Sequence, residues 1–476
     1  MKLLEINGGK KLTGTIRVSG AKNSAVALIP AILSDEEVTI CNVPDITDTE
    51  ALCEILSFLG ARVKRASETI VIDSKEIENK EIPATLAKKL RASYYFMGAL
   101  LGKYKKVTMS LPGGCSIGAR PINLHLKGFE ALGAKVTNKD NCYIVEADEL
   151  KGNNIYLDFA SVGATINIML AAVKAKGKTI IDNAAKEPEI VNVATLLNNM
   201  GAKIRGAGTS SIEIEGVDYL GKCFHEVIPD RIEAGTYVIL GAAVGENLKV
   251  DNIIPEHIES LTSKLEEMGA FLDIGSDYII VSRQDNYKSI HVKTQTYPGF
   301  PTDLQQPLTP LLTACKGQSK IEETIYENRF MHIPYLNSMG ADIRVKNQTS
   351  TIVGPTKLVG CDVVATDLRA GASSRSSVTS SPIWVGKVTV VISFSFIYLL
   401  MAMASLRILS GKIYRTAPAV RGANRSITDA SKQKLANSAT MSFGEVFLLS
   451  VIYSIRFNRF LCSIITPFGF PVEPEV

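Results

Sequence analysis

The chain has 476 residues, of which 46% are hydrophobic and 21% are charged. This composition is typical of a globular protein, and the length predicts two or three domains rather than one core. The formal net charge of +4 is unevenly spread: residues 1–373 hold 41 basic and 44 acidic residues, and residues 374–476 hold 11 and 4. The first part therefore lacks the basic surplus of a nucleic-acid-binding protein.

The cysteines and the N-terminus indicate a cytoplasmic protein. Eight cysteines are scattered along the chain, without CxxC pairs or zinc-type spacing, as expected of reduced thiols in the cytosol. Residues 1–12 contain no apolar stretch of signal-peptide length. Neither GxxxxGK[ST] nor a strand-borne GxGxxG is present, so no nucleotide cofactor is expected, and no metal either.

A phrase that joins a helix to a strand recurs five times. It reads FLGARV, ALGAKV, NMGAKI, EMGAFL and SMGADI, with its glycine at positions 60, 133, 201, 269 and 340. A short β-type run and, next, an amphipathic stretch precede each glycine. We therefore predict a repeated unit of strand, helix and strand, in which the glycine caps the helix in a left-handed conformation.

Such units have to pack on one another, because a single unit leaves its apolar face exposed. Three units precede residue 229 and two follow it, which predicts two similar lobes that cross near residues 227–231. Residues 23–33 and 163–173 are rich in small apolar side chains and predict buried helices.

The second unit is longer than the others because of the loop PGGCSIGARP at residues 112–121. Its prolines and glycines keep it out of helix and strand, so that Cys115 is presented at the centre of a loop. Loops on a rigid scaffold often carry catalytic groups. The loop chemistry by itself favours the other interpretation, a surface loop with an incidental cysteine.

Other candidate residues are weaker when taken singly. Lys22 and Asn23 stand in a turn before a helix, which suits an anionic ligand or a solvated lysine at a helix cap. Arg91 begins an apolar helix, and Arg120 and His125 follow the cysteine loop.

A proline-rich segment, YPGFPTDLQQP at residues 297–307, is expected to be irregular, and Asp303 is its only acidic residue.

Together, these segments resemble the UDP-N-acetylglucosamine 1-carboxyvinyltransferase family of enolpyruvyl transferases. The resemblance runs in order through residues 14–28, 112–125, 161–170, 187–192, 297–307, 327–332 and 365–373. It implies an α/β fold, an inside-out α/β barrel of repeated βαβαββ units in two similar domains, with the last unit missing or aberrant here. The implied domains are residues 22–228, residues 1–21 with 229–373, and a non-matching tail of residues 374–476.

The resemblance also implies a reaction and its site. The enolpyruvyl group of phosphoenolpyruvate would pass to the 3′-hydroxyl of UDP-N-acetylglucosamine, in the first committed step of peptidoglycan precursor synthesis. The implied catalytic residues are Cys115, which protonates the methylene carbon, together with Lys22, Asp303, Asp367 and Arg369. The implied substrate-binding residues are Lys22, Asn23, Arg91, Arg120, Pro121, Ile122, Asn123, Leu124, His125, Ser161, Val162, Gly163, Asp303, Ile325 and Arg329. The shikimate-pathway enolpyruvyl transferase shares the fold but lacks the cysteine loop and the TDLQ segment.

The resemblance stops after Ser373, where the family continues with a sixth unit that includes an arginine in an RGYE-like segment. The residues from Val388 to Leu406 are uncharged and mostly apolar. Three explanations remain open: a frameshifted reading frame, a membrane anchor, which alone would give the protein a membrane partner, or a divergent sixth unit. The alternative to an active transferase is a catalytically impaired UDP-sugar-binding product that lacks the sixth unit.

Overall fold

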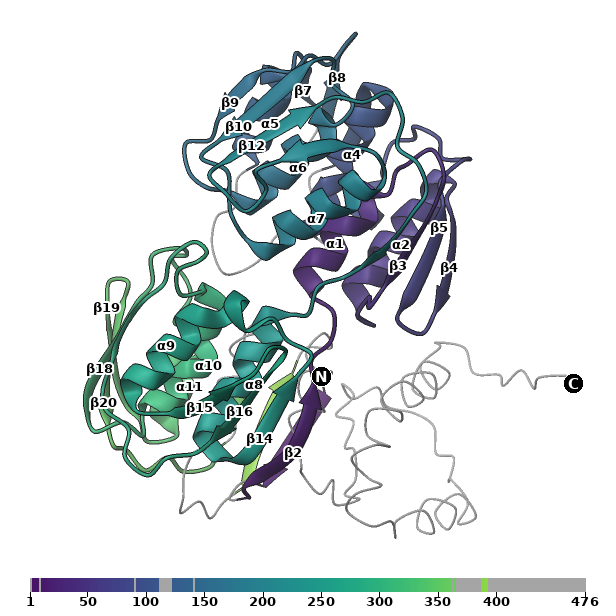
Figure 1. The fold of residues 1–476 in the computed structure, drawn as a ribbon. Coiled ribbons are helices and arrows are strands. Elements are labelled where there is room, and N and C mark those ends of the chain that lie inside the picture. The colour runs from purple at the N-terminus through teal and green to yellow at the C-terminus, as the bar shows by residue number, and fades with distance from the viewer. Residues whose placement is uncertain are drawn as a thin grey trace, which may run out of the picture.

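The computed structural model describes residues 2–7, 10–89, 91–110, 122–139, 142–361, 363–364 and 387–392. They form a mixed α/β protein built from several small mixed sheets. Figure 1 shows two lobes, one above the other, joined by two chain segments.

The upper lobe in Figure 1 contains most of the chain up to residue 226. Its elements are α1 (Lys22–Ala31), β3 (Glu37–Cys41), α2 (Thr47–Leu59), β4 (Arg62–Ala66), β5 (Thr69–Asp73), α3 (Ala84–Ala87), η1 (Arg91–Tyr94), α4 (Tyr95–Tyr104), β6 (Lys106–Ser110), α5 (Asn123–Ala131), β7 (Lys135–Lys139), β8 (Cys142–Glu146), β9 (Asn154–Tyr156), α6 (Val162–Ala172), β10 (Lys178–Asp182), α7 (Pro188–Asn199), β11 (Lys203–Arg205), β12 (Ser211–Glu215) and β13 (Cys223–Glu226).

The lower lobe combines the N-terminal strands with the later part of the chain. Its elements are β1 (Lys2–Asn7), β2 (Leu12–Arg17), α8 (Arg231–Val244), β14 (Gly245–Asp251), η2 (Pro255–Ile258), α9 (Glu259–Met268), β15 (Phe271–Ile274), β16 (Tyr278–Ser282), β17 (His291–Lys293), α10 (Thr302–Leu312), β18 (Gly317–Glu322), α11 (Ile333–Ser338), β19 (Asp342–Lys346), β20 (Thr349–Gly354), β21 (Val363–Val364) and β22 (Lys387–Ile392).

One strand order recurs in four sheets of the described chain. A parallel edge strand is followed by a central strand and an antiparallel hairpin, in the orders β13-β3-β5-β4, β9-β10-β12-β11, β2-β14-β16-β15 and β17-β18-β20-β19. The sheet β6-β8-β7 has the same hairpin, and an isolated parallel bridge from Ile82 to Met109 stands where its edge strand would be. The repeat predicted from the sequence therefore appears as a repeated sheet.

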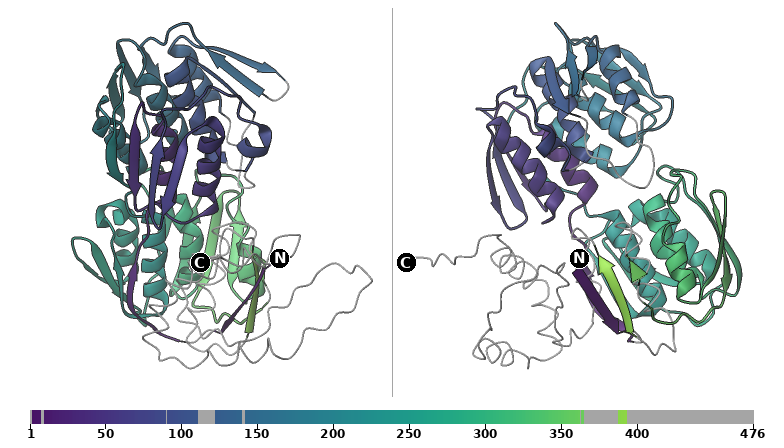
Figure 2. Two further views of the ribbon diagram at one scale, coloured as in Figure 1. Left: turned by 90° about the vertical axis from the view of Figure 1, so that its right-hand side faces the viewer. Right: turned by 180° about the vertical axis from the view of Figure 1, so that it is seen from behind.

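A further sheet is shared between the two ends of the described chain. β22 pairs in parallel with β21 and antiparallel with β1, and Figure 2 shows β1 and β22 side by side. Residues 387–392, which follow the end of the family resemblance, thus occupy an interior position in their sheet, as β3, β10, β14 and β18 do in theirs.

The five repeat glycines stand at the C-terminal ends of the helices in their units, as predicted. Their φ angles, at Gly60, Gly133, Gly201, Gly269 and Gly340, lie between 94° and 107°. A side chain is strained in this region of φ and ψ, whereas glycine adopts it at little cost. The prediction of left-handed caps is confirmed.

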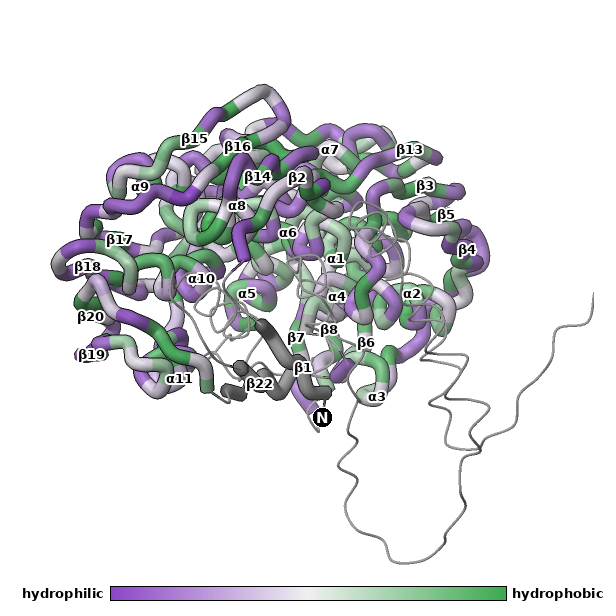
Figure 3. The backbone as a smooth tube through the Cα atoms, turned by 90° about the horizontal axis from the view of Figure 1, so that it is seen from below, coloured by the Kyte–Doolittle hydropathy of each residue, from purple (hydrophilic) through white to green (hydrophobic). Residues whose placement is uncertain are grey.

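The helices lie inside each lobe and the sheets outside (Figures 1 and 3). The predicted buried helices are α1 and α6, and almost every side chain of both is buried. Buried apolar residues form one core cluster between residues 21 and 227, and a second that joins residues 12–18 to residues 232–358. Each lobe therefore has its own hydrophobic core.

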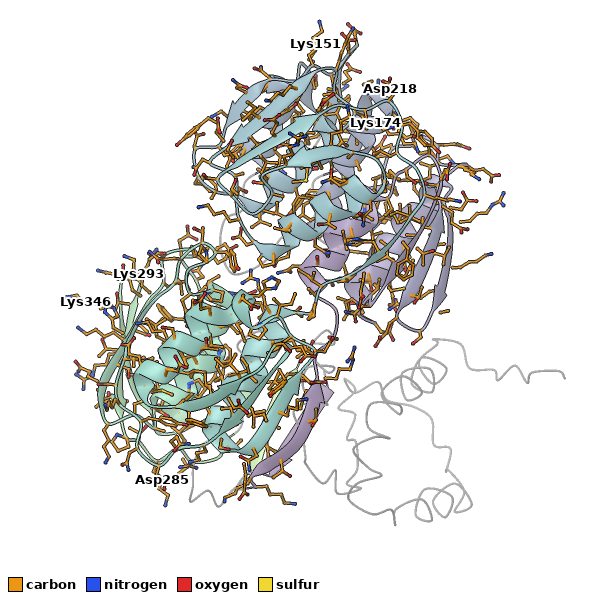
Figure 4. The ribbon with its side chains drawn as sticks, in the orientation of Figure 1. Lys151, Lys174, Asp218, Asp285, Lys293 and Lys346 are labelled. Atoms are coloured by element: carbon orange, nitrogen blue, oxygen red, sulfur yellow. The ribbon has the colours of Figure 1, made fainter. Side chains whose placement is uncertain are left out.

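Charged side chains such as Lys151, Lys293 and Lys346 project from the outer surfaces (Figure 4). Lys174 pairs with Asp35 (3.2 Å) and donates to the backbone carbonyl of Asp218 (2.8 Å), at the top of the upper lobe in that view. This cluster lies away from the junction of the lobes.

Two segments, residues 297–307 and 388–406, differ from the expectation or are described only in part. Residues 297–307 are not irregular throughout, because α10 begins at Thr302 and continues through Pro307 and Pro310. Complete burial of Leu304, Leu308 and Leu312 compensates for the hydrogen bonds that the prolines remove. Of the apolar run 388–406, the structure describes only residues up to 392, which form a strand, and no helix among the described residues is long and apolar enough to cross a membrane.

Candidate functional site

The two chain segments that join the lobes are hydrogen-bonded to each other. The amide of Ala21 donates to the carbonyl of Ile228 (2.7 Å), and the amide of Asp230 donates to the carbonyl of Ser19 (2.9 Å). The Asp230 carboxylate caps α8 with Oδ1 and accepts the amide of Lys22, the first residue of α1, with Oδ2 (3.1 Å). One carboxylate therefore ties the first helix of each lobe to the crossing.

Lys22, a predicted site residue, stands at the first position of α1. Its ammonium forms an ion pair with Asp48 in the first turn of α2. The Lys22 side chain is 38% exposed, so its charge is available to a ligand as well as to Asp48. Asn23 follows it on α1.

A second group of predicted residues meets around His125, which is buried in α5. Asn167 donates to Nδ1 of His125 (2.9 Å), which assigns the ring proton to Nε2. The ring of Tyr94 lies edge-on to the imidazole, with 4.9 Å between the ring centroids. A Cβ on Gly163 would lie 2.9 Å from the Tyr94 hydroxyl and 3.1 Å from His125 Cε1. Glycine at this position therefore lets the start of α6, which Ser161 caps, approach the imidazole.

In the lower lobe, Asp303 and Arg329 form a charged pair. Arg329 is buried, and its Nε donates to the hydroxyl of Thr302 (3.2 Å). Gln305 and Gln306 both donate to its backbone carbonyl (3.1 Å each). The Asp303 side chain keeps 29% exposure, so its carboxylate is held by a buried cation and yet open on one side.

Glu323 organises the neighbouring turn and was not predicted from the sequence. Its buried carboxylate accepts hydrogen bonds from Thr294 (3.0 Å), Thr302 (2.8 Å) and the amides of Ile325 (2.8 Å) and Tyr326 (3.2 Å). It thereby fixes the predicted residue Ile325 next to the start of α10.

A buried ion pair joins the lobes. Arg231, at the start of α8, lies 3.4 Å from Glu189 in α7, and their side chains are only 12% and 7% exposed. The Arg231 guanidinium also lies over the ring of Tyr297 at 5.5 Å. Burial opposes the charge of Arg231, but the carboxylates of Glu189, Glu187 and other nearby acids outweigh it and raise its pKa. Asp303 is one of these acids, which places the Asp303–Arg329 pair close to this bridge.

Glu187 carries a testable pH dependence. Burial raises the pKa of its carboxyl above the ordinary value of 4.5, and the Glu189 carboxylate adds to the shift. A raised pKa in the folded state means that the folded protein holds this proton more tightly, so stability falls as the pH rises above the ordinary value. Glu187→Gln should therefore be more stable than the unsubstituted chain near neutral pH, and the gain should vanish below the ordinary pKa.

Chemical denaturation across this pH range measures the effect. Glu226→Gln, on an exposed position of β13, is the control and should show no such gain. A gain from Glu187→Gln that is equal at all pH values would contradict the account.

The structure brings several predicted residues together and leaves others undescribed. Lys22 and Asn23 adjoin the crossing, while Ile122, Asn123, Leu124, His125, Ser161, Val162 and Gly163 lie at the starts of α5 and α6, and Asp303, Ile325 and Arg329 lie together in the lower lobe. Cys115, Arg120, Pro121, Asp367 and Arg369 lie outside the described residues, as does the side chain of Arg91. In the part that the structure describes, no cluster of His, Cys, Asp and Glu has the make-up of a metal site.

Sequence reasoning missed Asp48, Glu189 and Arg231. Glu189 belongs to the quoted segment 187–192, but nothing in the segment signals its partner, 42 residues later. Asp48 stands in the first turn of a helix, where acidic residues are common, so its pairing with Lys22 could not be predicted from the sequence.

The chain matches the family model of EPSP synthase (3-phosphoshikimate 1-carboxyvinyltransferase) over residues 6–378. It is 57% identical over 371 residues to UDP-N-acetylglucosamine 1-carboxyvinyltransferase 2 of Listeria monocytogenes, a match that covers 78% of this chain and 88% of that protein. The Bacillus subtilis protein of the same name is 56% identical over 374 residues, with 78% and 87% covered.

Solved structures show the same fold. The enolpyruvyl transferase NikO from Streptomyces tendae superposes with a TM-score of 0.76 at 24% identity, covering 85% of this chain and 97% of that one. EPSP synthase from Acinetobacter baumannii gives a TM-score of 0.63 at 19% identity, covering 82% and 94%. The sequence matches and the shared fold agree: the chain belongs to the EPSP synthase family of enolpyruvyl transferases, alongside its UDP-N-acetylglucosamine 1-carboxyvinyltransferases.

Proposed function

We propose that the protein transfers the enolpyruvyl group of phosphoenolpyruvate to the 3′-hydroxyl of UDP-N-acetylglucosamine and releases phosphate. The 57% identity over 371 residues to a relative named for this reaction carries the proposal. The reaction is the first committed step of peptidoglycan precursor synthesis. We place it in the cytoplasm, in line with the free cysteines among the described residues.

The proposed fold and domains follow the family pattern. We infer an inside-out α/β barrel of repeated βαβαββ units, with domains at residues 22–228 and at residues 1–21 with 229–373. The recurring strand order and the two separate cores support this division. Substrates held at the junction of the lobes would contact Lys22 from one lobe and Asp303 from the other.

The residues have distinct proposed roles. Asp303 accepts the proton of the attacking hydroxyl, and its ion pair with the buried Arg329 holds its carboxylate in place. Lys22, Arg120 and Arg369 neutralise the phosphate and carboxylate of phosphoenolpyruvate, with Asp367 beside them.

The UDP-sugar lies against a second set of residues in this proposal. The starts of α5 and α6 line it, where Gly163 lies close to the imidazole of His125. The rest of the lining consists of Asn23, Arg91, residues 121–124, Ser161, Val162 and Ile325.

Cys115 donates a proton to the methylene carbon of phosphoenolpyruvate in this scheme. A thiol has an ordinary pKa of about 8.5, so it is mostly protonated at neutral pH. Nearby cations such as Lys22 and Arg120 favour the thiolate, whereas a bound phosphate dianion favours the thiol. The pH profile of Cys115 alkylation should therefore move to higher pH when phosphoenolpyruvate binds. Alkylation rates measured with and without this ligand test it, and identical profiles would refute the coupling.

A second candidate is a catalytically impaired product that binds the UDP-sugar. Two observations favour it. The family match ends at residue 378 of 476, and the alignment covers 88% rather than all of the Listeria monocytogenes relative. The arginine that the family carries in its sixth unit would then be missing.

Phosphate release from phosphoenolpyruvate separates these candidates. The proposal requires release that depends on UDP-N-acetylglucosamine and does not occur with shikimate 3-phosphate as acceptor. Release with shikimate 3-phosphate alone would assign the reaction named by the family model instead. UDP-sugar binding without release would favour the impaired product.

A further inference from the structure

Lys22 occupies an unfavourable place for a cation. It is the first residue of α1, where the helix dipole is positive, and no acidic residue stands in the first turn of that helix. Its own amide is already held by Asp230. A lysine at such a place needs a compensating anion, which a ligand or another side chain has to supply.

Asp48 supplies such an anion from the neighbouring helix. It stands in the first turn of α2, a helix that packs against α1, and its side chain is 15% exposed. Among the described residues, its buried Oδ2 atom has no hydrogen-bond partner and forms an ion pair with the Lys22 ammonium. The carboxylate therefore depends on Lys22 for its partner.

The surrounding loop holds Asp48 in place. The Thr49 hydroxyl donates to the carbonyls of Pro44 (3.1 Å) and Ile46 (2.8 Å), and Arg65 pairs with Asp45 (2.9 Å). Asp48 thus faces Lys22 from the start of α2, and the contacts that brace this helix start do not involve the Lys22 side chain.

We propose that Asp48 is a built-in counter-ion that holds the Lys22 ammonium until the phosphate of the substrate replaces it. This rests on the proposed function only in taking a phosphate-bearing substrate as the ligand of Lys22. Asp48 is a positioning residue: its carboxylate holds the Lys22 ammonium in place, and it competes with the incoming anion. Phosphate binding is accordingly weaker, and release easier, than at an unpaired lysine.

The competition predicts a gain of affinity when the carboxylate is neutralised. In Asp48→Asn the shape of the side chain is kept but its charge is lost, so inorganic phosphate should bind the full-length chain about tenfold more tightly. Asp48→Glu keeps the charge and should bind phosphate as the unsubstituted chain does. Titration calorimetry with inorganic phosphate measures both. A damaged fold would lower the affinity, so a gain separates this role from a merely structural one.

Asp45→Asn is the matched control, because it removes a nearby carboxylate that pairs with Arg65 and not with Lys22. Its phosphate affinity should be unchanged. Asp48→Ser, which also suits the first turn of a helix, replaces Asp48→Asn if that variant fails to fold.

Unchanged or weaker binding by the neutral variant, or no phosphate binding by the unsubstituted chain, overturns the inference. If phosphate binds and the gain is seen but no enolpyruvyl transfer occurs, the proposed function fails and the counter-ion stands.

Discussion

Asp303→Asn is expected to lower kcat by about 10²–10⁴-fold, the range for loss of a general base. The asparagine keeps the size of the side chain and its place beside Thr302 at the start of α10. It removes the group that accepts the proton of the attacking hydroxyl and leaves the buried Arg329 without its anionic partner. Steady-state turnover of phosphoenolpyruvate and UDP-N-acetylglucosamine measures the loss.

Glu322→Gln is a suitable control for this substitution. Glu322 pairs with Lys293 (2.9 Å) on the surface of the same lobe, with side chains 36% and 50% exposed. This variant should keep the activity of the unsubstituted chain. If Asp303→Asn retained full kcat, Asp303 would not be the base.

Glu189→Leu should lower the free energy of unfolding by about 3–5 kcal/mol, because it leaves the buried Arg231 without its partner. The double variant Arg231→Met with Glu189→Leu removes both charges and should recover most of that loss. Denaturant unfolding of the two variants measures the difference. A surface pair in the upper lobe, Lys203 with Glu215, gives the control, and its removal should leave stability unchanged.

A result in which Glu189→Leu is harmless would show that Arg231 is solvated and that the lobes are not joined through this pair. A double variant no more stable than Glu189→Leu would assign the loss to packing of the aliphatic stems instead.

The repeated design could be predicted from local sequence patterns. Gly60, Gly133, Gly201, Gly269 and Gly340 mark the helix ends, because only glycine adopts the required φ without strain. The buried helices α1 and α6 followed from their runs of small apolar residues. Each of these signals lies within about a dozen neighbouring residues.

The pairings that assemble the site were not predictable in this way. Lys22 meets Asp48 because two helix N-termini pack together, and Glu189 meets Arg231 because the chain crosses between lobes. Glu323 binds Thr302 from 21 residues away. The helix at Thr302 was missed because prolines usually exclude helix, whereas burial of Leu304 and Leu308 stabilises it here.

The tail shows the same limit. Residues 387–392 have the apolar, β-branched composition of a strand, yet their pairing with β1 joins positions at opposite ends of the lobe's sequence. Nothing in either segment alone identifies the other.

Enolpyruvyl transfer by this chain can be tested from the product itself. The full-length protein is incubated with phosphoenolpyruvate and UDP-N-acetylglucosamine, and the UDP-sugar is examined by NMR and mass spectrometry. We expect an enolpyruvyl ether at the 3′-oxygen, formed together with phosphate in equal amounts. Unmodified UDP-N-acetylglucosamine, recovered from a folded protein that binds it, would contradict the claim and leave a UDP-sugar-binding product.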